Sequence, residues 1–176
     1  ARFDIEPGDF LFVPAGTVHA ILGGTLVCEI QQSSDTTYRL WDWGREPARE
    51  LHLEQSWEVI DLSEAREPVI TPPVGTIARP IRLVECEFFR VWALDVAPGQ
   101  GADLAALLAA ERDGEPIGAL VLCAVAGSAR VVGEQGEAAL PLGGCVFLPA
   151  CCKGAARVVA TGGATTRILL AESTEL

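Results

Sequence analysis

The chain has 176 residues, which leaves room for one domain of ordinary size or two small ones. Its formal net charge of −11 argues against a nucleic-acid surface, because phosphate backbones require clustered positive charge. The longest apolar stretch, residues 117–126, is about half as long as a membrane span requires, and no pattern typical of a signal peptide is present. Composition therefore predicts a soluble cytoplasmic protein with neither nucleic-acid nor membrane partners.

The first 43 residues alternate between apolar runs and turn signals. Residues 10–13 predict a short buried strand between glycine and proline turns, and residues 25–31 predict another after a Gly-Gly turn. Residues 50–61 change to a helical period, with an apolar face at Leu53, Trp57 and Ile60. Four prolines then predict a linker at residues 66–81.

A β pattern resumes after the linker. Short strands separated by glycine-rich turns indicate a closed β-barrel or sandwich, and an Ala/Leu-rich stretch at 103–112 favours a helix. The strand candidates are 83–94, 118–126, 128–133, 137–141, 144–149, 155–160 and 165–171.

The chain contains an internal repeat. Residues 8–15 and 143–150 share the pattern of a glycine, five residues, a proline and an alanine. Two related β domains are therefore expected, but they are unequal. Residues 1–65 hold too few strands to close and predict the C-terminal part of a first barrel, whereas residues 82–176 predict a complete second barrel.

A histidine motif follows the first repeat. Residues 8–19 read GDFLFVPAGTVH, with the spacing G-x5-P-x-G-x2-H, and this resembles the second conserved motif of the cupin superfamily. The resemblance implies a mainly β, cupin-like barrel in which His19 faces inward and binds a divalent metal. The alternative is a barrel histidine that binds no metal.

The following segments sharpen the resemblance. Residues 29–43 read EIQQSSDTTYRLWDW and residues 49–53 read RELHL. Together with VPAGTVHAI they look like bacterial type I phosphomannose isomerases (mannose-6-phosphate isomerases) over residues 7–61. The second barrel matches that family's C-terminal domain in layout.

The resemblance implies three site residues. His19 matches the family's C-terminal zinc ligand, Arg39 an arginine that faces the substrate, and Glu29 an acidic residue of the pocket that could shuttle a proton. On one continuous strand Glu29 and Gln31 would share a face, and Arg39 would keep that parity if no bulge intervened. The alternatives are a structural ion pair for Glu29 and a surface salt bridge for Arg39.

Other candidate residues have plainer interpretations. His52, on the helix side, is expected to pack or cap rather than to bind metal. Three tryptophans could stack on a sugar, although core packing is the expectation for Trp41, Trp43 and Trp57. The cysteines form no CxxC pair and predict buried thiols in a reducing compartment; they are Cys28, Cys86, Cys123, Cys145, Cys151 and Cys152.

The departures from the family pattern are equally informative. The family's remaining zinc ligands come from a Gln-x-His pair and a glutamate in the N-terminal half, and no His-x-His occurs here. In the second copy Gly154 replaces His19 and Cys151 replaces Gly16. That barrel is therefore expected to lack a metal site and to act as a scaffold or lid.

These observations lead to one principal hypothesis and two alternatives. The chain is expected to carry part of a zinc-dependent isomerase that interconverts mannose 6-phosphate and fructose 6-phosphate, and to be inactive alone. Its first-barrel strands would pair with a missing N-terminal half, a second copy or the second barrel. The alternatives are a non-enzymatic, metal-free cupin module that binds a sugar phosphate or a protein, and an isomerase of another sugar.

Overall fold

The chain divides into two units, Ala1–Val69 and Ile70–Leu176. The computed structural model describes residues 2–63, 69–70, 79–109 and 118–174. The boundary falls within the predicted linker, residues 66–81, most of which lies outside the described residues. That the first unit is the end of a catalytic barrel stays a prediction.

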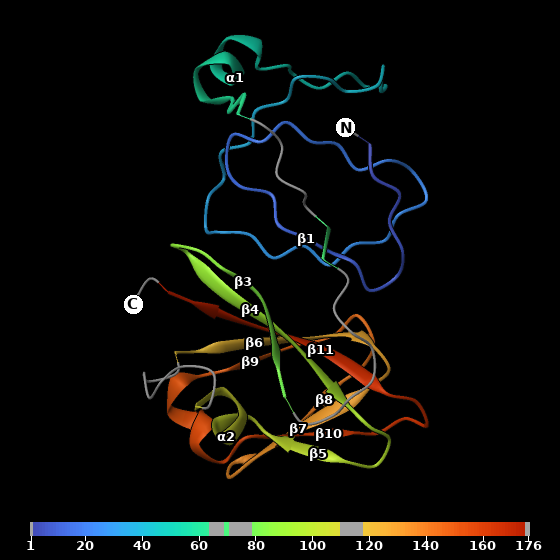
Figure 1. Ribbon diagram of the computed structural model, residues 1–176, viewed down its shortest axis with the longest axis vertical. Helices are drawn as coiled ribbons and strands as arrows, with labels where there is room; N and C mark the ends of the chain where they lie inside the picture. Colours follow the sequence, from blue (N-terminus) through green and yellow to red (C-terminus); the bar gives the residue numbers. More distant parts are fainter. Residues whose placement is uncertain (1, 64–68, 71–78, 110–117, 175–176) are drawn as a thin grey trace. The chain divides into compact units, whose positions relative to one another are not determined.

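The first unit has little regular structure (Figure 1). It contains strand β1 (Phe10–Leu11) and helix α1 (Leu53–Val59), and β1 pairs with the short strand β2 (Val69–Ile70) at the boundary. The predicted helix is confirmed. The prediction of a strand at residues 25–31 is wrong, because a strand requires a ladder partner and the described residues offer it none.

Much of the first unit's apolar surface is exposed. Trp41, Trp43 and Trp57 are each about two-thirds exposed, at 66%, 68% and 70%. The expectation that these tryptophans pack in a core is therefore wrong within the described chain. Leu53, on the predicted apolar face of α1, is also 49% exposed.

In the part of the second unit that the structure describes there are two antiparallel sheets and two short helices. The five-stranded sheet has the order β3 (Ile81–Glu85), β4 (Phe89–Val96), β11 (Thr166–Ser173), β6 (Leu120–Ala126), β9 (Cys145–Leu148). The four-stranded sheet has the order β5 (Gly101–Asp103), β10 (Arg157–Ala160), β7 (Ala129–Gly133), β8 (Gly136–Leu140). The helices are α2 (Leu104–Ala109) and the 3₁₀ turn η1 (Ala150–Ala155).

The core of this unit lies between the two sheets. Trp92, Leu122 and Leu170 from the larger sheet and Val131 and Val158 from the smaller one belong to one buried cluster, which α2 extends at one end (Figure 1). The predicted mainly β fold is thus confirmed. Within the described residues no hydrogen-bond ladder joins one sheet to the other, so the two sheets are not closed into the complete barrel that the sequence predicted.

Most predicted strands of the second unit match observed ones. The exception is the candidate at 83–94, which is two strands, because the chain reverses at residues 86–88. There the amide of Cys86 donates to the carbonyl of Phe89 at 3.0 Å, and β3 and β4 pair on either side.

The internal repeat appears in the structure as a turn before each repeated strand. In residues 6–9 the amide of Asp9 donates to the carbonyl of Glu6 at 3.1 Å, and in residues 141–144 the amide of Gly144 donates to the carbonyl of Pro141 at 2.8 Å. The third residue of each turn is a glycine with positive φ, 101° at Gly8 and 73° at Gly143. Both copies therefore enter their strand through the same glycine-dependent turn.

A second pair of turns follows the strands, and there the copies diverge. Residues 14–17 and 149–152 each form a turn closed by an amide-to-carbonyl bond, at 3.2 and 2.9 Å. Gly16 has a φ of 82°, whereas its counterpart Cys151 lies in the 3₁₀ turn η1. The first copy continues without a helix to His19, while the second coils through Gly154.

Candidate functional site

His19 follows the glycine turn of the first unit and is exposed. Its Nδ1 lies 2.9 Å from the carbonyl oxygen of Thr17. A carbonyl can only accept, so this hydrogen bond requires Nδ1 to carry the proton. In neutral imidazole the lone pair is then on Nε2, so Nε2 is the ring nitrogen that could bind a ligand.

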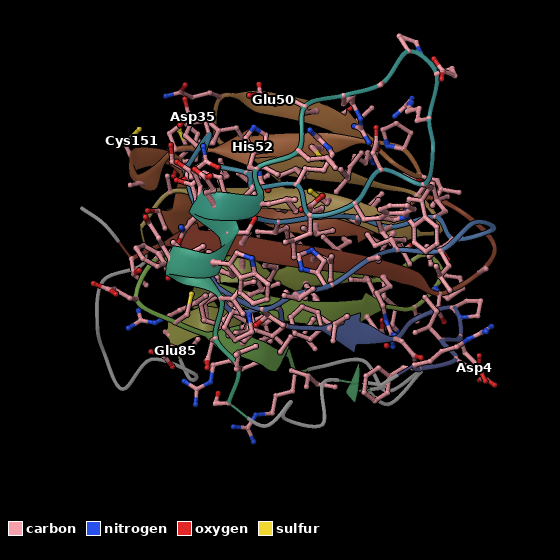
Figure 2. The ribbon with its side chains drawn as sticks, turned by 90° about the horizontal axis from the view of Figure 1, so that it is seen from above. Asp4, Asp35, Glu50, His52, Glu85 and Cys151 are labelled. Carbon is pink, nitrogen blue, oxygen red and sulfur yellow. The ribbon has the colours of Figure 1, made fainter. Side chains whose placement is uncertain are left out.

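Arg39 is hydrogen-bonded to His52 and Glu50, two residues of the segment that leads into α1 and that Figure 2 labels. Its backbone amide donates to Nδ1 of His52 at 3.1 Å, and its carbonyl accepts from the His52 amide at 2.8 Å. The guanidinium Nη1 also donates to the carbonyl of Glu50 at 3.1 Å. Arg39 is half-buried, and these hydrogen bonds engage both its backbone and its guanidinium.

His52 is thus a structural residue, as expected, although its ring does not cap the helix. It occupies the N-cap position of α1 without a side-chain cap, and its backbone carbonyl accepts from the amide and hydroxyl of Ser56, at 2.9 and 2.6 Å. The ring lies 6.0 Å from that of Tyr38. Its contribution to the candidate site is to position Arg39.

An ion pair that sequence reasoning did not identify lies next to Arg39. Nε of Arg49 donates to both carboxylate oxygens of Asp42, at 3.1 and 2.9 Å, and Nη2 also contacts this carboxylate. This hydrogen bonding, with the positive charges of Arg49, Arg39 and Arg45, lowers the pKa of Asp42 from its ordinary value of 3.8. Arg49 belongs to the RELHL segment of the family resemblance, and this was the signal in the sequence that could have identified it.

Glu29 is exposed and lies outside any strand. The parity argument that placed it on one face with Gln31 required a continuous strand, so that argument fails. Residues 31–35 instead line a shallow, open hollow. Within the described chain no hydrogen bond or ion pair joins Glu29 to His19 or Arg39, and the roles of all three stay predictions.

The described residues do not form a metal site by themselves. No group of three or more His, Cys, Asp or Glu side chains within them is arranged to hold a metal ion. Zinc sites in proteins take three or four protein ligands. His19 suits one ligand position, but the part of the chain that the structure describes does not supply a zinc-binding set.

Sequence comparison identifies relatives over about half of the chain. Mannose-6-phosphate isomerase ManA of Bacillus subtilis is 46% identical over 96 residues, and mannose-6-phosphate isomerase of Streptococcus mutans is 36% identical over 103. Half of this chain is homologous to mannose-6-phosphate isomerases. The matched residues make up 51% and 54% of this chain but only 30% and 32% of these isomerases, so the chain spans about a third of their length. No protein-family model matches the chain.

Solved structures of two cupin proteins resemble the chain in part. A cupin-2 domain protein from Shewanella frigidimarina covers 56% of this chain and 83% of its own, with 13% identity and a TM-score of 0.40. A cupin 2 conserved barrel protein from Salinispora arenicola covers 53% of this chain and 72% of its own, with 18% identity and a TM-score of 0.41. Within the described residues, no helix has the length and apolar character of a membrane span.

Proposed function

We propose that this chain is part of a zinc-dependent, cytoplasmic isomerase that interconverts mannose 6-phosphate and fructose 6-phosphate. The homology to mannose-6-phosphate isomerases supports the enzyme class. The observation that carries the site is the hydrogen bond between His19 Nδ1 and the Thr17 carbonyl. Metal-binding histidines usually donate their other ring nitrogen to such an acceptor, which fixes the tautomer and ring orientation.

Arg39 and Glu29 would handle the sugar. In an aldose–ketose isomerisation a base removes the proton from C2 and returns it to C1 through an enediol, and we assign this base to Glu29. Arg39 would hold the developing negative charge or the phosphate with its planar fork. The hydrogen bonds of Arg39 with His52 and Glu50 support this role, because charge stabilisation requires a donor that is already in place.

The remaining zinc ligands would come from outside this chain. The relatives are about three times longer than the matched region, and the described residues supply one suitable ligand. We therefore propose that residues 1–65 complete a site whose other ligands lie in a longer product. The 176-residue chain alone is expected to bind zinc weakly and to show no isomerase turnover.

Two substitutions in a longer product that contains this chain test the assignment. His19→Ala is expected to lower zinc content, measured by elemental analysis. Arg39→Ala is expected to keep zinc but to lower kcat/KM by a factor on the order of 10², because it removes a charge-stabilising donor. Arg130→Ala is the matched control, since Arg130 is an exposed arginine of the second unit that pairs with Glu137.

The outcomes separate the proposals. Equal loss of zinc in His19→Ala and Arg39→Ala would refute the role of Arg39 as a substrate residue. Normal zinc in His19→Ala would refute its role as a ligand. A longer product that binds mannose 6-phosphate without turning it over would favour the non-enzymatic cupin module.

A further inference from the structure

Two cysteines face each other across neighbouring strands of the second unit. Cys123 on β6 and Cys145 on β9 are direct partners in the antiparallel ladder, and these strands lie side by side in Figure 1. Their sulfur atoms are 2.9 Å apart. The two thiols, 22 residues apart in sequence, are thus close enough to form a disulfide after a small movement.

The ladder places this pair at the position that best suits a bridge. The amide of Ala124 donates to the carbonyl of Gly144, and its carbonyl accepts from the amide of Gly143, at 3.1 and 2.8 Å. Backbone groups along a strand point alternately to its two neighbours. Cys123 and Cys145 therefore form a non-hydrogen-bonded pair, in which Cα atoms lie about 4.5 Å apart, within the range that disulfides span.

The two thiols differ in accessibility. Cys145 is exposed on β9, which lies at the edge of the five-stranded sheet, whereas Cys123 is only 7% exposed on the inner neighbour β6. A dissolved oxidant can therefore reach Cys145 first. Cys123 is in position to attack whatever forms there.

We propose that Cys123 and Cys145 form a redox-modifiable dithiol site that reacts with low-molecular-weight disulfides such as oxidised glutathione. The Cys145 thiolate attacks the glutathione disulfide, forms a mixed disulfide and releases one glutathione thiolate. The Cys123 thiolate then attacks the Cys145 sulfur, closes the protein disulfide and releases the second. The protein loses two protons and two electrons, and one oxidised glutathione becomes two reduced molecules.

The other close pair of cysteines is less suited to this reaction. Cys151 and Cys152 are adjacent in η1 with their sulfurs 3.7 Å apart, and neighbours in sequence rarely form a disulfide. The hydrogen bond with Cys151 raises the pKa of Cys152, so less of the reactive thiolate is available. This pair can therefore be removed to simplify the test.

The experiment uses the full chain with Cys151→Ser and Cys152→Ser as background. Tryptic cleavage at Arg112, Arg130 and Lys153 then leaves Cys123 and Cys145 alone in separate peptides. After treatment with oxidised glutathione, mass spectrometry is expected to show these peptides cross-linked, with the loss of two hydrogen masses. The melting temperature should rise by at least about 5 °C, because the bridge closes a loop around β7 and β8.

Two further variants identify the order of attack. Cys123→Ser is expected to stop at a stable glutathione adduct on Cys145, whereas Cys145→Ser is expected to react much more slowly. Persistent glutathione adducts on both cysteines of the background protein, or bridging of Cys145 to Cys28 or Cys86 instead, would overturn the proposal.

Discussion

At the scale of single residues, hydrogen bonds to backbone groups and one ion pair determine which partners the charged side chains of the candidate site have. His52 and Glu50 fix Arg39 through backbone groups and one ring nitrogen, and Arg49 takes up the charge of the nearby Asp42. The pairing of Asp42 with Arg49 leaves Arg39 bonded to a neutral carbonyl. This arrangement agrees with the proposed binding of an anionic ligand by Arg39.

The Asp42–Arg49 pair gives a pH prediction. Because the folded-state pKa of Asp42 is lowered, its stabilising effect is fully present above the ordinary pKa of 3.8 and is lost as pH falls through the lower folded value. Arg49→Gln is expected to raise the pKa of Asp42 towards 3.8, which ¹³C titration of the carboxyl group would measure. Arg45→Gln, which removes only a more distant charge, should raise it less; an unchanged pKa in Arg49→Gln would refute the pairing.

At the scale of elements, the repeated turn–strand–turn unit shows what sequence could and could not predict. Both copies share their first turn because glycine permits the positive φ that it needs, and a proline begins the second turn in each, so these signals can be read directly from the sequence. Residues 25–31 have the same strand-like pattern but form no strand, because pairing depends on a partner that the local sequence does not encode. The hydrogen bond between Arg39 and His52, 13 residues away, could not be predicted for the same reason. His19, by contrast, was identified as a candidate from the spacing of the glycines and proline before it.

Two glycines with positive φ, Gly16 in the first copy and Gly143 in the second, can be compared although they occupy different positions of the repeat. A Cβ at Gly16 would lie 2.6 Å from the carbonyl oxygen of Val59, and the Gly16 carbonyl accepts from the Asp61 amide at 2.9 Å. Gly16→Ala is therefore expected to combine a strained φ with a backbone clash and to abolish the protection of the Asp61 amide from hydrogen exchange. Gly143→Ala meets open space and should cost only about 1 kcal/mol of backbone strain; equal effects of the two would contradict the role of the Gly16 contact.

At the scale of the whole molecule, the second unit carries the regular structure and the packed core. Its strands were predicted well because each apolar run finds a neighbour within the unit. One polar feature of this unit was not predicted. Arg167 on β11 and Asp95 on β4 are ladder partners and form a doubly hydrogen-bonded ion pair, with both distances 2.7 Å and side chains 11% and 8% exposed.

Removal of one partner of this pair is expected to destabilise the fold strongly. Arg167→Leu leaves the Asp95 carboxylate buried without its main counter-charge and should lower the free energy of unfolding by roughly 3 kcal/mol. The double variant Asp95→Leu with Arg167→Leu should recover most of that loss, because it removes both charges. Urea unfolding of the two variants measures this difference, and a double variant as unstable as the single one would contradict it.

The position of β11 has a consequence for folding during synthesis. This strand comes after every other strand of the second unit in the chain, yet it lies at the centre of the five-stranded sheet, between β4 and β6. Until residues 166–173 leave the ribosome, the sheet exists only as two separate pairs, β3 with β4 and β6 with β9, each with an open edge. Such edges favour association with other chains, so a ribosome that pauses before this strand should expose the nascent protein to aggregation and chaperone binding.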